Sequence, residues 1–333
     1  MTAYTKRLQK VTAVLCTTAL LAGCAAGTSD NTEPAATAAQ VKTITIEPTA
    51  AYQTMNGFGA SACWWSQEVG NWKNAKDILS LLYDENSGIG LNIYRYNLGA
   101  GSKDDATITD PDRRAEAFID KDGSYHWERD AAAQNALALA KSMNEDLRVT
   151  LFSNSAPVFY TANGKAYCDY LPDDEKYVTN LEPERYADFA KYGIACAKHF
   201  TEAGYRVTGL SPINEPEWSW RGYEDGTAKQ EGCYYSKTQC RDLYKVFLKQ
   251  MAQEDALKDC RLEGWESGHI GTDTCMAYLK TMFGKSGVNW LKNGALRKGM
   301  PTLALHSYWA SPEERQAFAD AIATTYGSNY SWR

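Results

Sequence analysis

The sequence predicts an α/β fold, a (β/α)8 or TIM barrel, from two observations. Strand-like and helix-like stretches alternate six times, which is typical of parallel strands joined by right-handed helical crossovers. The fourth strand-like stretch leads into Asn214-Glu215-Pro216, and a carboxylate where a strand becomes a loop is typical of the catalytic rim of a barrel. A doubly wound open sheet is the alternative, but no Gly-rich phosphate loop follows the first barrel strand.

The elements follow in order from the periodicity of apolar residues. A strand over residues 41–47 precedes the barrel and is assigned to a side sheet. Barrel strands are expected at residues 55–61, 90–98, 148–154, 207–215, 261–266 and 302–309, and helices at 74–83, 129–144, 184–203, 236–256, 274–283, 290–296 and 312–326. Residues 328–333 begin what should be a seventh strand, so we expect a barrel that is incomplete at its C-terminus, with strands seven and eight absent.

Particular residues set several of these boundaries. Pro216 cannot donate to a strand ladder, so the fourth strand is expected to stop at Glu215. Ser236 and Gln239 have the spacing of a capping box at a helix start. Gly204 suits the C-terminal cap of the preceding helix.

Composition limits the class of protein. The 333 residues are 44% hydrophobic and 12% aromatic, which is enough for one large domain with a sizeable core. A net charge of −6 argues against a nucleic-acid partner, because nucleic acids bind basic surfaces. No Cys or His residues have zinc-ligand spacing, so we expect neither a metal site nor a cofactor.

The N-terminus has the pattern of an export signal. Basic residues precede an apolar stretch over residues 11–21, which is too short to span a bilayer. Small residues and then Cys24 come directly after this apolar stretch, as in a bacterial lipoprotein signal. An ordinary secretory signal is the alternative. We therefore expect a signal peptide (1–23), a flexible tether (24–40) and a barrel domain (41–333) that is lipid-anchored through Cys24 to the membrane, on the extracellular face of the cell envelope.

Seven cysteines follow residue 24. An odd number in an exported chain leaves at least one thiol unpaired. Cys233 and Cys240 are close enough in sequence to bridge a loop, but the sequence alone does not fix any pairing.

Several motifs together resemble glycoside hydrolase family 30. They are Asn56-Gly-Phe-Gly-Ala-Ser61, Arg95-Tyr-Asn97, Ser153-Asn-Ser-Ala-Pro157, Asn214-Glu-Pro216 and His306-Ser-Tyr-Trp309, in the family's order. The Trp64-Trp65 pair and Arg95-Tyr-Asn-Leu-Gly99 are most similar to its endo-β-1,6-galactanase-like branch. The resemblance implies a (β/α)8 barrel with a small β-sandwich, and a retaining mechanism with glutamates at the ends of strands four and seven.

The resemblance also implies roles for individual residues. Glu215 matches the acid/base, and Asn214 matches the residue that hydrogen-bonds the sugar 2-hydroxyl, although it is equally natural as a turn residue before proline. The nucleophile matches nothing in the chain. Tyr330-Ser-Trp332-Arg333 is similar to the approach to it, so we expect the nucleophile beyond the chain end.

Other candidates line the predicted rim. Arg95 is expected to orient a catalytic carboxylate or to form a structural ion pair. Glu266 ends strand five and is read as cleft-lining or as a rim charge. The remaining substrate-binding candidates are His306, Tyr308, Trp64, Trp65, Trp218, Trp220 and Trp309, where His306 and Tyr308 have a barrel-core alternative and roughly half of the tryptophans are expected in the core.

The sequence thus predicts a retaining glycoside hydrolase that cleaves β-linked polysaccharide outside the cell, with β-1,6-galactan as the first candidate. One alternative is a non-catalytic glycan-binding surface lipoprotein. Another is a glycanase of the same family that acts on xylan, β-1,6-glucan or glucosylceramide.

Overall fold

A computed structural model describes residues 55–172, 177–283, 302–326 and 331–332, together with Thr45 and Glu47. Met55–Arg333 form one compact unit, in which every described helix and strand lies. The strands are β1 (Gly59–Ser61), β2 (Ile93–Asn97), β3 (Arg148–Phe152), β4 (Arg206–Ser211), β5 (Arg261–Ser267), β6 (Thr302–Leu305) and β7 (Ser331–Trp332). The α-helices are α1 (Ser66–Val69), α2 (Ala75–Tyr83), α3 (Ala131–Met143), α4 (Tyr186–Glu202), α5 (Lys237–Met251), α6 (Asp273–Phe283) and α7 (Pro312–Tyr326). Short 3-10 helices are η1 (Pro111–Arg113), η2 (Val158–Tyr160), η3 (Pro183–Arg185) and η4 (Asp255–Leu257).

The strands form one parallel sheet in which each strand pairs with the next one in the sequence, from β1 to β7. The register sets Arg95 of β2 beside Ser61 of β1 and Thr150 of β3. A doubly wound sheet reverses its strand order part-way, whereas a barrel adds its strands in one rotational direction. The sequential order therefore confirms the barrel-type arrangement over the described strands and rules out the open-sheet alternative for them.

The start of a seventh strand, expected within residues 328–333, is confirmed by β7. The two residues of β7 pair with β6 in parallel register, Ser331 beside Thr302 and Trp332 beside Leu303, so the start of a seventh strand is present. The predicted side-sheet strand over residues 41–47 falls outside the described residues except for Thr45 and Glu47, neither of which is in a strand. The helix predicted over residues 290–296 also lies outside them.

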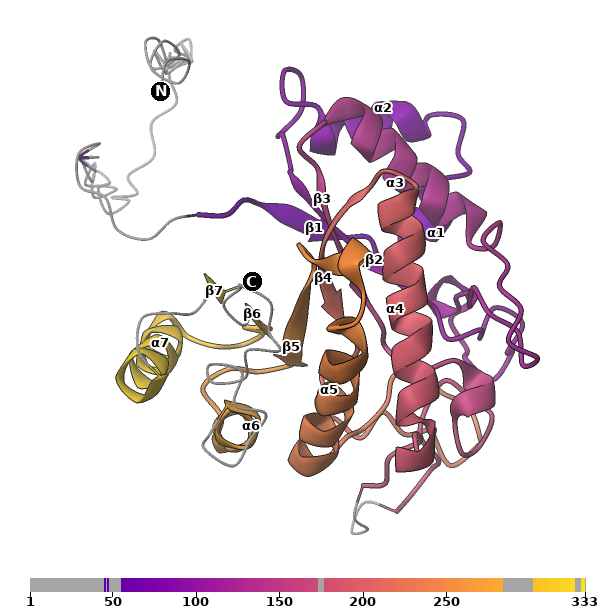
Figure 1. Cartoon of the computed structure of the whole chain (residues 1–333), viewed down its shortest axis with the longest axis vertical. Helices are drawn as coiled ribbons and strands as arrows, with labels where there is room; N and C mark the ends of the chain where they lie inside the picture. The colour runs from indigo at the N-terminus through magenta and orange to yellow at the C-terminus, as the bar shows by residue number, and fades with distance from the viewer. Residues whose placement is uncertain are drawn as a thin grey trace, which may run out of the picture. The chain divides into compact units, whose positions relative to one another are not determined.

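The helices pack over the sheet and against one another (Figure 1). Helices that are adjacent in the sequence pack side by side, α2 against α3, α4 against α5 and α5 against α6. Fully buried aromatic side chains such as Phe189, Phe200 and Phe247 fill the space between them, and each buried Phe contributes about 1.5–3 kcal/mol. Among the described residues, no helix combines the length and the apolar character needed to cross a bilayer.

The central strands carry buried polar groups between them. Thr150 of β3 donates a hydrogen bond of 3.3 Å from Oγ1 to Glu263 Oε1 of β5. A Cβ atom on Gly209 of the intervening strand β4 would lie 1.9 Å from that same oxygen. Gly209 therefore makes room for a carboxylate inside the sheet.

Residue chemistry explains where the elements around the site begin and end. The fourth strand ends at Ser211 and not at Glu215 as predicted; Pro212, which follows, already lacks the N–H that the ladder needs. The predicted capping box at the start of α5 is confirmed, because Ser236 Oγ accepts from the Gln239 amide and Gln239 Oε1 accepts from the Ser236 amide. Gly204, with φ of +89°, follows α4 as predicted.

Candidate active site

The ends of β4 and β5 bring two glutamates to the same edge of the sheet. Glu215 lies four residues beyond Ser211, the last residue of β4, and Glu266 is the penultimate residue of β5. The Glu215 amide donates a 2.9 Å hydrogen bond to the Glu266 carbonyl oxygen. Both residues have left-handed backbones, with φ of 47° and 56°, a conformation that costs a non-glycine residue about 1–3 kcal/mol. The backbone therefore holds both side chains at one place.

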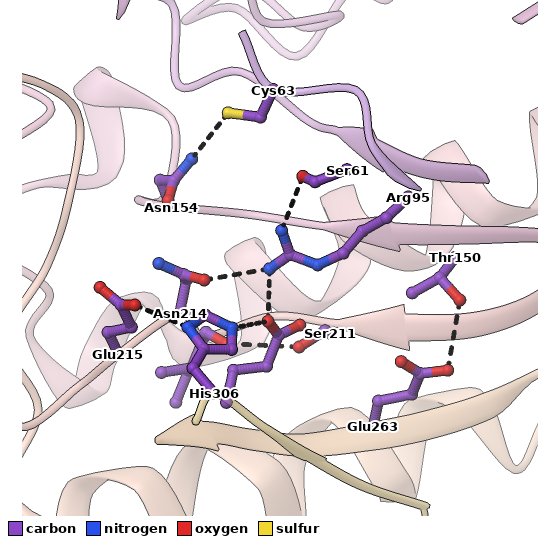
Figure 2. Close-up of polar contacts among 12 residues, drawn as sticks. Ser61, Cys63, Arg95, Thr150, Asn154, Ser211, Asn214, Glu215, Glu263 and His306 are labelled. Atoms are coloured by element: carbon purple, nitrogen blue, oxygen red, sulfur yellow. Dashed lines mark hydrogen bonds and ion pairs between the residues drawn. The ribbon is translucent and has the colours of Figure 1, made fainter. Parts of the chain in front are cut away.

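His306, which directly follows β6, lies beside Glu215 (Figure 2) and contacts the carboxylates of both glutamates. Its Nδ1 is 2.6 Å from Glu215 Oε1, and its Nε2 is 3.0 Å from Glu266 Oε2. An imidazole that donates through both nitrogens carries two protons and a positive charge. The backbone of His306 is fixed too, since its amide donates to the Ser267 carbonyl at 2.7 Å.

Arg95 of β2 completes the cluster from the opposite side (Figure 2). Its guanidinium donates to Ser61 Oγ at 3.1 Å, to Asn214 Oδ1 at 3.0 Å and, as an ion pair, to Glu266 Oε2. The guanidinium also lies over the ring of Phe152, which adds a cation–π attraction. Arg95 therefore orients both Asn214 and Glu266.

The opposite charges in the cluster shift its pKa values. Burial alone would raise the pKa of Glu266, but the Arg95 guanidinium and the hydrogen bond from His306 outweigh it and lower the pKa to about 2. Burial alone would lower the pKa of His306, but its hydrogen bonds to Glu215 and Glu266 raise it to about 9. At neutral pH the cluster therefore contains an imidazolium and an ionised Glu266.

Glu217 is a site residue that the sequence patterns did not single out. Its Oε1 accepts hydrogen bonds from Ser267 Oγ and, at 2.7 Å, from the Gly268 amide, and burial raises its pKa. Next to it, the Trp218 indole packs on Gly268, where a Cβ atom would lie 2.2 Å from the indole nitrogen. Glu217 thus ties the loop of Glu215 to the loop that follows Glu266. The available signal was its position two residues after Glu215, in the turn that follows that residue.

Three exposed aromatic side chains adjoin the cluster and form what we call the aromatic rim. Trp218, Tyr308 and Trp309 are 42%, 53% and 78% exposed. Their rings meet edge to face, with centroids 6.4 Å apart for Trp218 and Trp309 and 5.6 Å for Tyr308 and Trp309. Tyr308 in turn contacts His306, with centroids 5.2 Å apart. The aromatic rim therefore extends outward from the paired glutamates.

The other predicted tryptophans are more buried. Trp65 packs against the core and donates its indole N–H to the Ser61 carbonyl at 2.8 Å. Trp220 also packs against the core and donates to the Glu215 carbonyl at 2.7 Å, so it supports the backbone of that glutamate. Trp64 is half-buried beyond β1.

Residues 41–319 match the family described as O-Glycosyl hydrolase family 30. The chain belongs to this family. Among curated relatives, an endo-β-1,6-galactanase of Hypocrea rufa is 31% identical over 219 residues, which are 58% of this chain and 43% of that protein. An exo-β-1,6-galactobiohydrolase of Bifidobacterium longum subsp. longum is 27% identical over 247 residues, 56% of this chain and 16% of that protein. The chain thus spans less than half the length of either relative.

Solved structures of other proteins have a fold similar to that of this chain. A conserved exported protein from Bacteroides fragilis has a TM-score of 0.73 at 25% identity, covering 85% of this chain and 60% of that one. An endo-β-1,6-glucanase has a TM-score of 0.61 at 17% identity, covering 86% of this chain and 58% of that one, and this likeness concerns the fold alone.

The raised pKa of His306 predicts a pH-dependent contribution to stability. The folded-state pKa of about 9 lies above the ordinary value of 6.5, so the contribution is complete below about pH 6.5 and is lost as the pH rises through about 9. The melting temperature of the wild-type chain should exceed that of His306→Gln most strongly at pH 6, and the difference should disappear above about pH 9.

A matched control is His199→Gln, because burial lowers the pKa of His199 and moves its titration in the other direction. Calorimetry at pH 5 to 10 measures all three proteins. An advantage over His306→Gln that stays constant across this range would contradict the charged-imidazole assignment.

The contacts of Glu217 predict that it stabilises the joined loops. Glu217→Ala removes the acceptor of the Ser267 hydroxyl and the Gly268 amide, and it should lower the free energy of unfolding by about 1–3 kcal/mol. Glu224→Ala is the control, since Glu224 is exposed in the same loop and should change stability by less than about 0.5 kcal/mol. Equal effects of both substitutions in urea unfolding would remove Glu217 from the site.

Proposed function

We propose that this family 30 protein is a retaining glycoside hydrolase that cleaves β-linked polysaccharide, with β-1,6-galactan as its substrate type and Glu215 as its acid/base. The observation that carries the proposal is the pairing of Glu215 with His306 and Glu266 where β4, β5 and β6 end. The names of the two curated relatives, both β-1,6-galactan-directed, support the substrate type.

The hydrogen bond between His306 and Glu215 supports an acid/base role. An acid/base residue must be held within hydrogen-bond reach of the atom that it protonates, and the 2.6 Å contact from His306 Nδ1 to Glu215 Oε1 fixes the position of that carboxyl group. A retaining enzyme places its second carboxylate about 5–5.5 Å from the first. Glu215 then donates its proton to the glycosidic oxygen and later removes one from the attacking water.

Glu266 has the properties of a positioning residue and not of the nucleophile. Its side chain is 2% exposed, and Oε2 accepts from both Arg95 and His306. A nucleophile must reach the anomeric carbon, whereas Oε1, the other oxygen of Glu266, is buried away from the surface. We therefore propose that the nucleophilic carboxylate comes from residues after Arg333, on the strand that β7 begins.

Asn214 and the aromatic rim are the proposed sugar contacts. Because Arg95 holds the Asn214 oxygen, the NH2 group of that amide is directed to the other side, where it can donate to the sugar 2-hydroxyl. The exposed rings of Trp218, Tyr308 and Trp309 offer apolar faces to further sugar units.

We also propose that the protein is exported and anchored through Cys24. The support is the sequence pattern before Cys24 and the similar Bacteroides fragilis protein, which is described as exported. A polymeric glycan outside the cell requires an enzyme at the surface.

The acid/base role predicts the behaviour of Glu215→Gln in a longer form of the protein that continues past Arg333. Gln keeps the shape but has no transferable proton, so release of reducing ends from β-1,6-galactan should fall about 10²–10⁴-fold. A substrate with an activated leaving group should lose less, and added azide should restore turnover by attacking the glycosyl-enzyme. The sugar product should retain its anomeric configuration in early NMR spectra.

Glu266→Gln is the matched control. It should lower activity by disturbing Arg95 and His306, and azide should not rescue it. Azide rescue of Glu266→Gln and not of Glu215→Gln would reverse the assignment, and inversion of configuration would remove the retaining mechanism. A longer form that binds galactan without cleaving any β-glycan would support a glycan-binding protein.

The anchoring proposal predicts that a labelled fatty acid is incorporated into the wild-type chain and not into Cys24→Ala. A lipoprotein signal directs the lipid to the cysteine that becomes the first residue of the mature chain, which is Cys24 here. Cys16→Ala is the control, because Cys16 lies inside the expected signal peptide, and its labelling should equal that of the wild type. Equal labelling of Cys24→Ala would eliminate the anchor.

A further inference from the structure

Two cysteines from different connections lie together next to the loop of Glu215. Cys168 lies between η2 and η3, in the connection from β3 to α4, and Cys233 lies just before α5, in the connection from β4. The two connections run beside each other, since the Cys168 amide donates to the Trp220 carbonyl at 2.9 Å and the Gly232 amide donates to the Ala166 carbonyl at 2.9 Å. Backbone hydrogen bonds therefore fix the stretches on either side of both thiols.

The sulfur atoms face each other within this frame. The Tyr234 amide donates to Cys168 Sγ at 3.4 Å, which places that sulfur beside the backbone of the residue after Cys233. Cys233 Sγ donates to the carbonyl of the same residue, Tyr234, at 3.6 Å, the two thiols interact with each other, and both residues are buried, at 3% and 1% exposure. Thr179, whose Oγ1 is 3.7 Å from Cys233 Sγ, lies against the pair.

The sequence spacing also allowed a bridge between Cys233 and Cys240, but the thiol of Cys240 has a different contact. Its thiol donates to the Tyr235 carbonyl, 3.9 Å away, within the first turn of α5. The Cys240 side chain is therefore turned to the backbone just before α5, whose start the Ser236 capping box holds.

We propose that Cys168 and Cys233 form a disulfide when the protein meets a disulfide donor, such as a thiol-oxidising protein of an export compartment. The thiolate of one cysteine attacks the donor disulfide, forms a mixed disulfide and releases one donor thiol. The second cysteine attacks the protein sulfur of that mixed disulfide and releases the other donor thiol. Two protons and two electrons pass from the cysteines to the donor, which is reduced to a dithiol.

The local environment differs between the two sulfur atoms. Burial alone would raise the pKa of Cys233, but the hydrogen bonds around its sulfur, that of Cys168 foremost, lower it. The hydrogen bond to Cys233 and burial raise the pKa of Cys168. Cys233 therefore has the greater thiolate character of the two.

The bond would close a loop of about 65 residues, which strongly restricts the unfolded chain. It would also tie the connection that holds Trp218 and Trp220 to the neighbouring connection. This bond is independent of the hydrolase proposal, because it concerns sulfur chemistry and not the glutamates.

The test uses the full 333-residue chain, reduced and then equilibrated with oxidised glutathione. After denaturation, alkylation and proteolysis, mass spectrometry should find the peptides of Cys168 and Cys233 joined. The oxidised chain should melt about 5–10 °C higher than the chain in dithiothreitol. This measurement needs no variant and does not depend on where the protein resides.

Variants complete the test. Cys168→Ser and Cys233→Ser should each lose the joined peptides and the dithiothreitol-sensitive part of the melting temperature. Cys196→Ala, a control at another buried cysteine, and Cys240→Ala should keep both. Quantitative alkylation of Cys168 and Cys233 after oxidation, or a bond between Cys233 and Cys240, would overturn the proposal.

Discussion

The protonated imidazole of His306, between Glu215 and Glu266, is the interaction on which the rest of the site depends. Two carboxylates at one sheet edge repel each other, and buried charges are tolerated only when they are paired and hydrogen-bonded. His306 supplies one positive charge between them, and Arg95 supplies a second on the far side of Glu266. The cluster therefore contains two positive and two carboxylate groups, which lets charged side chains persist at low exposure.

This balance of positive and negative charges depends on the order of the strands in the sheet. The charged groups come from β2, which holds Arg95, and from the ends of β4, β5 and β6, where Glu215, Glu266 and His306 lie. Arg95 and His306 are more than 200 positions apart in the sequence. Because neighbouring strands in the sequence are neighbours in space, their ends converge without any long crossing. The direct hydrogen bond from Glu215 to Glu266 and the contacts of Glu217 then lock adjacent loops together.

The sequence predicted what depends on periodicity and on short motifs. Alternating strands and helices indicated the parallel order, and the motif around Glu215 indicated the sheet edge where it lies. The sequence did not predict that Glu266 would form an ion pair with Arg95, because that contact joins residues 171 positions apart. The end of β4 was predicted too late, at Glu215 before Pro216, whereas Pro212 is the first proline after the strand and already lacks the N–H that the ladder needs. Glu217 and the paired thiols of Cys168 and Cys233 were missed for a similar reason, since side-chain partners across loops leave no local pattern.

The left-handed backbones of Glu215 and Glu266 have an evolutionary consequence. Glycine and asparagine occupy this region of φ readily, whereas glutamate does not. Random substitution under selection for folding alone would therefore tend to replace both glutamates with residues that relax the main chain. The two glutamates therefore keep a main-chain conformation that costs the folded chain about 1–3 kcal/mol each.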